Sequence, residues 1–115
     1  MNTTTFDWMR ERVDEVRAFR AYNELMLDEL AANAFKGDRE GWREYSPEKC
    51  LSEIHHHVAK LHVVSVELAR RRRGEEPREL PWPSDLEDLV CEFGADVGNC
   101  CMQLLDSLDL LDIPE

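Results

Sequence analysis

Residues 84–111 read SDLEDLVCEFGADVGNCCMQLLDSLDLL, and this stretch decides the fold. Its apolar side chains recur at steps of three and four, which is the spacing of one face of an α-helix. They are Leu86, Leu89, Phe93, Val97, Cys100, Leu104, Leu108 and Leu111. Ser84 and Glu87 have the spacing of a capping box, so we expect Ser84 to be the N-cap of this helix. A stripe of this length is expected to be buried against other helices.

A second helix is predicted from Pro47, with Ser46 as its N-cap, to Arg73, with Gly74 as its stop. Its apolar stripe consists of Leu51, Ile54, Val58, Leu61, Ser65 and Leu68. The stretch from Gly74 to Pro83 contains three prolines, which exclude regular structure there. A linker this short favours an antiparallel arrangement of the two helices that it joins.

The first segment, from Thr5 to Phe35, also has helical spacing and is either one long helix or two helices with a break near residue 20. Its apolar residues include Phe6, Met9, Val13, Val16, Leu27, Leu30, Ala31 and Ala34. Gly37 ends it, and residues 36–42 are expected to form a loop. No segment alternates with period two. The sequence therefore predicts an all-α protein, an antiparallel bundle of three to five helices in a single domain over residues 1–115.

The acidic excess of the chain is concentrated in its last third. The 115 residues include 25 acidic and 14 basic ones, a net charge of −11, and residues 81–115 hold nine acids and no lysine or arginine. We therefore expect no contact with a nucleic-acid backbone or a membrane surface. Such a segment suits a hard cation, a basic partner or simple solvation.

The sequence shows neither an apolar run long enough to cross a membrane nor a secretory signal, so we expect a cytoplasmic protein. Its cysteines form no CxxC pair and are interpreted as reduced thiols packed in the core: Cys50, Cys91, Cys100 and Cys101. A zinc site of His56 or His57 with Cys50 or Cys91 is less favoured, because no zinc-ligand spacing supports it.

Two rows of polar residues lie at steps of three and four, one on each predicted helix of the antiparallel pair. They are Glu53, His56, His57 and Lys60 on the second helix, and Glu92, Asp96, Asn99 and Gln103 on the third. Facing each other, they would form an oxygen-rich site suited to Mg²⁺ or Mn²⁺. The structural alternative is the ordinary polar boundary of an amphipathic helix.

These residues also occur in an order that resembles a known family. Asn33-x-x-Lys36-Gly37-Asp38 precedes Trp42, then Glu53-x-x-His56-His57-x-x-Lys60-Leu61, then Glu92-x-x-Ala95-Asp96-Val97-Gly98-Asn99 with Met102. The order resembles the MazG-like branch of the all-α nucleoside triphosphate pyrophosphohydrolases, and is closest to small stand-alone phage and prophage members. The resemblance covers residues 24–106.

The resemblance implies a hydrolase that converts a nucleoside triphosphate and water to the monophosphate and pyrophosphate, with Mg²⁺ or Mn²⁺ as cofactor. It also implies a homodimer or homotetramer. The implied catalytic residues are Glu53, Glu92 and Asp96, and the implied metal ligands are these three with His56. The implied substrate contacts are Lys36, Trp42, His57, Lys60 and Asn99.

The chain departs from the family pattern at two positions. Phe93 stands three residues before Asp96, where the family has glutamate, and the glutamate lies one place earlier at Glu92. His56 replaces the second glutamate of the first motif, and imidazole is a poorer magnesium ligand than a carboxylate. Both changes would weaken the activity. The alternatives are a non-catalytic nucleotide-binding protein or an acidic interaction or inhibitor protein of phage type.

A helical oligomer without any small-molecule site is a third possibility. Gly94 and Gly98 lie four residues apart on the predicted third helix and leave a strip with little side-chain bulk. Another helix can approach closely along such a strip.

Overall fold

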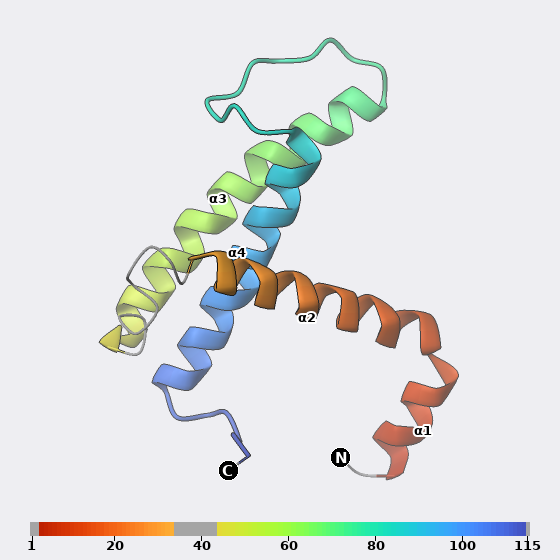
Figure 1. The fold of residues 1–115 in the computed structure, drawn as a ribbon, viewed down its shortest axis with the longest axis vertical. Helices are drawn as coiled ribbons and strands as arrows, with labels where there is room; N and C mark the ends of the chain where they lie inside the picture. The colour runs from red at the N-terminus through yellow and green to blue at the C-terminus, as the bar shows by residue number, and fades with distance from the viewer. Residues whose placement is uncertain (1–2, 34–43, 115) are drawn as a thin grey trace.

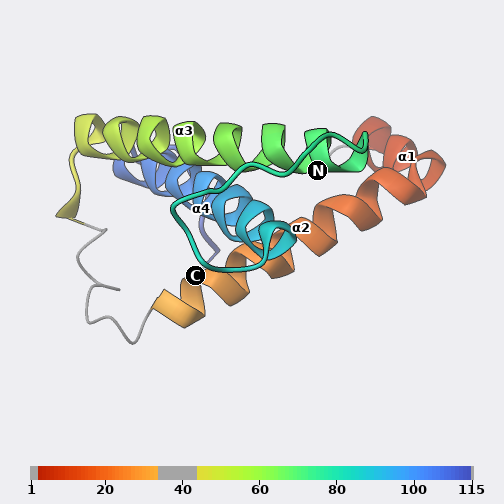
Figure 2. The same ribbon diagram turned by 90° about the horizontal axis from the view of Figure 1, so that it is seen from above.

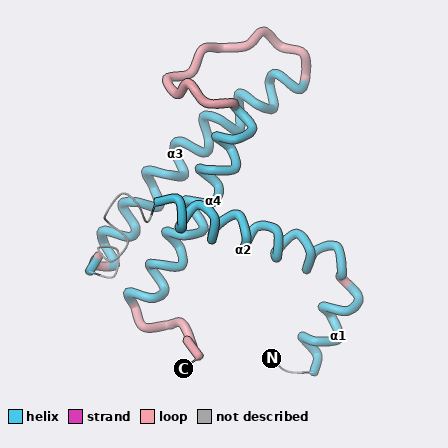
Figure 3. The backbone as a smooth tube through the Cα atoms, viewed as in Figure 1, coloured by secondary structure: helices cyan, strands magenta, loops and turns pink. Residues whose placement is uncertain are grey.

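The structure is a computed structural model that describes residues 3–33 and 44–114. It contains the helices α1 (Thr3–Glu11), α2 (Val13–Asn33), α3 (Pro47–Arg72) and α4 (Leu86–Ser107), as Figure 1 shows. The described residues include no strand (Figure 3), so the predicted all-α class is confirmed. None of the described helices is both long and apolar enough to cross a membrane.

Helices α3 and α4 lie side by side and run antiparallel, joined by the loop at the top of Figure 1. Helix α2 crosses α4 with its second half, and its first half extends away from the antiparallel pair (Figures 1 and 2). Helix α1 packs against α2 and against no other helix in the described part of the chain.

The ends of α3 follow from local chemistry and match the prediction. Ser46 is the N-cap, and its Oγ accepts a hydrogen bond of 3.1 Å from the backbone N–H of Lys49. Pro47 occupies the first turn, where its missing N–H leaves no hydrogen bond unmade. Arg73 is the C-cap, and Gly74 takes a φ of +81°, a left-handed conformation that glycine adopts without strain.

A buried carboxylate fastens the following loop to the end of α3. Glu67 accepts hydrogen bonds from Arg71 Nε at 2.7 Å and from the backbone N–H of Arg78 at 2.9 Å. Arg71 in turn donates to the carbonyl of Arg78 at 3.0 Å, and Arg70 Nε lies 3.4 Å from Glu67. The hydrogen bond from Arg78 and the contact with Arg71 hold the pKa of Glu67 below its usual range. Arginines of the basic run therefore position the loop.

Helix α4 begins and ends differently from the prediction. Its N-cap is Asp85, one residue after the expected Ser84, and no side chain caps its first turn. Its last residue is Ser107, because Asp109 adopts a left-handed φ of 57° that stops the helix. Leu108, expected in the buried stripe, is therefore 47% exposed.

The core lies where α3 and α4 approach the loop that joins them. Its buried members are Val64, Leu86, Leu89 and Phe93, with Leu61, Leu68, Leu80, Trp82 and Val90 packed against them. Trp82 meets Phe93 edge to face at 5.2 Å between ring centroids, so the loop also contributes to the core. Leu51 and Val58 of the predicted α3 stripe are each 45% exposed, because only one side of α3 meets α4.

The break in the first segment lies at Arg12, and the expected position near residue 20 was wrong. The apolar spacing continues past residue 20 through Phe19, Tyr22 and Met26, in agreement with a continuous α2. The second half of α2 contacts α4. The less exposed side of that half carries Leu25, Met26, Glu29 and Leu30, whereas Leu27 is 56% exposed.

The predicted glycine strip is the crossing point of α2 and α4. A Cβ atom at Gly98 would overlap Met26 Sδ and the Tyr22 hydroxyl, so the close approach requires glycine. Tyr22 donates a hydrogen bond of 2.6 Å to the carbonyl of Gly94, and Asn99 Nδ2 donates one of 2.9 Å to the carbonyl of Met26. The helix that uses the strip belongs to the same chain.

Candidate functional site

The crossing of α2 and α4 gathers three carboxylates. One oxygen atom from each of Glu29, Glu92 and Asp96 lies within 4.8 Å of the other two. Glu92 and Asp96 are four residues apart, a spacing that keeps both side chains on the same face of α4. Three carboxylate oxygens are the kind of ligand that Mg²⁺ and Mn²⁺ prefer. The structure thus brings Glu92 and Asp96 together, as expected, and adds Glu29.

Glu29 was not among the residues singled out in the sequence, because the side of α2 that packs toward α4 is known only from the fold. It lies between Met26 and Leu30 on the side of α2 that packs toward α4. A carboxylate on the packed side of a helix requires a partner or a ligand, because burial disfavours an isolated charge. The expected apolar residues of this segment included Leu27, which is exposed, and Leu30, which lies on the same side as Glu29.

His57 of α3 joins this carboxylate group to Glu53. Its Nε2 lies 3.7 Å from Glu53 Oε2, and its Nδ1 lies 3.6 Å from Asp96 Oδ2. The Nδ1 atom is buried and forms no hydrogen bond to any described residue. Glu53 is also held by Lys49, whose Nζ lies 3.1 Å from Glu53 Oε1. Of the two histidines proposed for the site, His57 therefore faces the acidic cluster.

The surroundings of His57 favour its neutral form. Burial lowers the pKa of His57, the positive charge of Lys60 and neighbouring His56 lower it further, and Glu53 and Glu29 oppose them. A neutral imidazole retains one ring nitrogen with a free electron pair, which can accept a proton or a hydrogen bond.

His56, expected as a metal ligand, is exposed and does not belong to the carboxylate group. Its ring packs edge to face against His57 at 5.3 Å between centroids. Successive helical residues point about 100° apart, so only one of these two neighbours can face α4.

Phe93 occupies the position where the family pattern has glutamate, and the structure shows why glutamate would not fit there. Its side chain is only 3% exposed and belongs to the core with Val64 and Leu89. Lys60 lies over the Phe93 ring, with Nζ 4.5 Å from the centroid. Glu92, one residue earlier, supplies the carboxylate of this turn instead. Its carboxylate lies close to that of Glu29 on α2.

The structure places the other expected substrate contacts in different surroundings. Asn99 is 9% exposed, and its amide is bonded to α2. The ammonium group of Lys60 lies over the Phe93 ring and is close enough to His57 to lower its pKa. Lys36 and Trp42 lie outside the described residues.

Cys100 lies one helical turn after Asp96 on α4 and is buried. Burial, with the charges of Asp96 and Glu53, raises the pKa of Cys100 to about 12. The three donors of the carboxylate group are oxygens, which favour a hard cation over zinc.

Comparison with known proteins identifies no family model, no curated protein and no solved structure that matches the chain.

Proposed function

We propose that the chain is a hydrolase of nucleoside triphosphates, with a divalent cation held by Glu29, Glu92 and Asp96. The observation that carries the proposal is the convergence of three carboxylates from α2 and α4 within 4.8 Å. The donor set fits Mg²⁺ or Mn²⁺, because all three ligands are oxygens. The order of motifs along the chain, which resembles MazG-like pyrophosphohydrolases, supports the triphosphate as substrate.

A cation at this position would offset the charge of the phosphates and polarise the attacking water. The chain itself supplies a proton acceptor in His57, whose pKa is lowered by burial and whose buried Nδ1 forms no hydrogen bond to any residue that the structure describes. Glu53, 3.7 Å from the other ring nitrogen, would stabilise the imidazolium that forms when His57 accepts the proton. Glu53 thus acts through His57, and Lys60 offsets phosphate charge nearby.

The first test is an assay of the chain with the common ribo- and deoxyribonucleoside triphosphates and Mg²⁺ or Mn²⁺. The expected products are nucleoside monophosphate and pyrophosphate, and chelation of the cation abolishes their release. Glu29→Gln and Asp96→Asn are each expected to lower the turnover by about 100-fold, the upper end of the loss seen when groups that support a metal ion are replaced. Asp28→Asn is the matched control, because Asp28 is exposed and adjacent to Glu29. Wild-type turnover in Glu29→Gln would contradict the assignment.

A second candidate function is cation-dependent nucleotide binding without hydrolysis. The burial of Phe93 favours it, because the family position itself carries no carboxylate and the one of Glu92 comes from the neighbouring position. In that case titration calorimetry would show nucleotide binding that requires Mn²⁺ and residue Asp96, while no pyrophosphate is released.

A further inference from the structure

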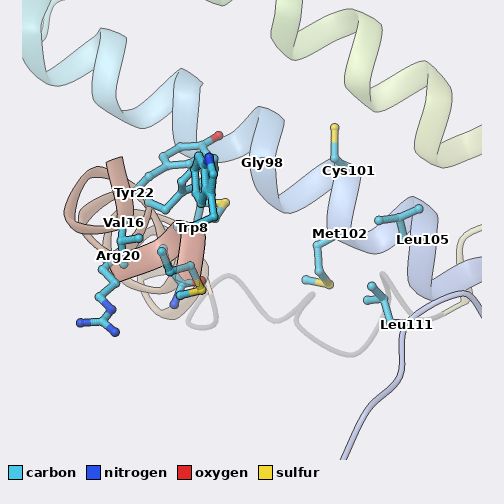
Figure 4. A pocket seen from close by; sticks show the side chains of 13 residues that line it. Trp8, Val16, Arg20, Tyr22, Gly98, Cys101, Met102, Leu105 and Leu111 are labelled. Atoms are coloured by element: carbon cyan, nitrogen blue, oxygen red, sulfur yellow. The ribbon is translucent and has the colours of Figure 1, made fainter. Parts of the chain in front are cut away.

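An apolar groove lies between the start of the chain and the end of α4 (Figure 4). We call residues 3–20, that is α1 and the first half of α2, the arm. The groove has a volume of about 750 Å³, and the arm forms one wall with Trp8, Val16 and Phe19. Met102 and Leu105 of α4 line the opposite wall. Each wall therefore presents apolar side chains from a helix.

The walls of the groove are open to solvent. Phe19 is 71% exposed, Trp8 is 45% exposed and Leu105 is 41% exposed. A small-molecule site usually buries about 70–90% of its ligand, and walls this open would leave much of a small ligand in water. A contiguous apolar surface of this kind instead marks contact with a macromolecule. An α-helix, about 10–12 Å across with its side chains, is wide enough to contact both walls at once.

Methionine is the most frequent residue type in the lining of the groove. Three of the four methionines of the chain lie there, namely Met9, Met26 and Met102. The methionine side chain is unbranched and flexible, so it adapts to apolar side chains of different shapes. Surfaces of this composition bind the apolar face of amphipathic helices. The lining therefore favours a helix as the occupant.

The charges beside the groove select the kind of helix. Asp106, Asp109 and Asp112 follow the α4 wall and form no ion pair with any residue in the described ranges. Residues 81–115 contain no basic residue, and the chain has a net charge of −11. A basic helix is attracted to this end of the molecule, whereas an acidic helix is repelled. Arg20 borders the groove on the arm side, so the basic residues of the occupant are expected to face α4.

We propose that the groove binds an amphipathic α-helix of a partner protein, with lysine or arginine residues along the flank beside Asp109 and Asp112. The apolar face of that helix packs between the arm and α4, and its basic side chains pair with the carboxylates. The inference goes beyond the proposed hydrolase activity and does not depend on it, because the groove and the carboxylate group share no residue.

The test uses the full chain and a synthetic helix as the probe. The probe is a fluorescein-labelled peptide of leucine and lysine, roughly 15 residues long, with leucine at helical steps of three and four. Fluorescence anisotropy is expected to show saturable binding of one peptide per chain. A peptide with glutamate in place of lysine is expected to bind about tenfold more weakly. A peptide of the same composition with its leucines spread around the helix is expected not to bind. Equal binding of either control peptide would overturn the proposal.

The apolar wall is tested with one pair of variants. Phe19→Ser is expected to weaken binding of the leucine-lysine peptide about tenfold, as truncation of a central aromatic contact does. Phe19 is 71% exposed, so its replacement does not disturb a core, and circular dichroism verifies that the helices remain. Val63→Ser is the matched control, because Val63 is 43% exposed on α3 and lies outside the groove. It is expected to bind the peptide as the wild type does, and an equal loss in the two variants would overturn the proposal.

The acidic flank is tested with a second pair. Asp109→Asn combined with Asp112→Asn is expected to weaken binding several-fold and to reduce its dependence on salt. Glu76→Gln combined with Glu79→Gln removes the same charge from exposed positions of the loop between α3 and α4, and should leave binding unchanged. Equal effects of the two pairs would show that the peptide binds the acidic surface without a preferred site, and would overturn the proposal.

Sedimentation equilibrium of the same samples tests the other possible occupant, a second copy of the chain. The wild-type mass is expected to be the same as that of Phe19→Ser, and to increase by one peptide per chain on binding. A self-associated wild type that the peptide does not dissociate, together with a monomeric Phe19→Ser, would show that a second copy fills the groove. That result would overturn the proposal.

Discussion

At the scale of the residue, the two glycines of α4 have different roles although the sequence shows them as equivalent. Gly98 lies directly under Met26 and Tyr22, whereas a Cβ atom at Gly94 would meet only Leu61 Cδ1, at 4.0 Å. The contact at Gly98 brings α2 close enough to α4 for Glu29 to reach Asp96. Gly98 is therefore the small residue on which the carboxylate group depends.

Replacement of the two glycines separates these roles. Gly98→Ala is expected to lower the free energy of unfolding by about 1–3 kcal/mol, because the added methyl group overlaps the side chains of α2. Gly94→Ala is the control and is expected to raise the free energy of unfolding by up to about 1 kcal/mol, because alanine favours the helix and the space is open. Urea denaturation measures both. Equal free energies of unfolding for the two variants would show that α2 does not pack closely against Gly98.

The residues of the site were only partly predictable from the sequence. Glu92 and Asp96 could be found because a step of four on one helix fixes their common face. Glu29 could not, because its neighbour in space comes from a helix 60 or more residues away and depends on how α2 crosses α4. The same limit explains the choice of His56 as a ligand, since the rotation of α3 about its axis is set by contact with α4.

At the scale of the element, local signals predicted the ends of α3 but not those of α4. Ser46, Pro47 and Gly74 act on their own backbone, so the type of residue is sufficient. The start of α4 depends on the loop before it, which is anchored by Glu67 to α3 and by Trp82 to the core. Such anchors join residues distant in sequence, and no local pattern shows them.

The anchor at Glu67 gives the stability of the chain a dependence on pH. The folded pKa of Glu67 lies below the unfolded value of about 4.3. The stabilisation is therefore fully present above the unfolded value and is lost as the pH falls through the folded one. We expect Glu67→Gln to lower the thermal midpoint at neutral pH and to reduce the loss of stability on acidification. Scanning calorimetry from pH 7 to pH 3 measures this, with exposed Glu79→Gln as a control that should match the wild type.

At the scale of the whole molecule, the fold is an antiparallel pair of helices crossed by a third that carries an extended arm. The pair and its linker followed from the sequence, because apolar stripes and prolines define them. The direction of the arm did not, since few contacts within the chain determine it.

Helices α2 and α4 both contribute to the proposed cation site, because Glu29 lies near the last turn of α2 and Glu92 and Asp96 lie on α4. A cation that binds all three carboxylates stabilises the form of the chain in which α2 is docked on α4, and that docked form binds the cation more tightly by the same factor. Saturating Mn²⁺ is therefore expected to raise the thermal midpoint of the chain, and Glu29→Gln should abolish the increase. An equal increase in Glu29→Gln would show that the cation binds elsewhere. The crossing of the two helices would then depend on the supply of a divalent cation.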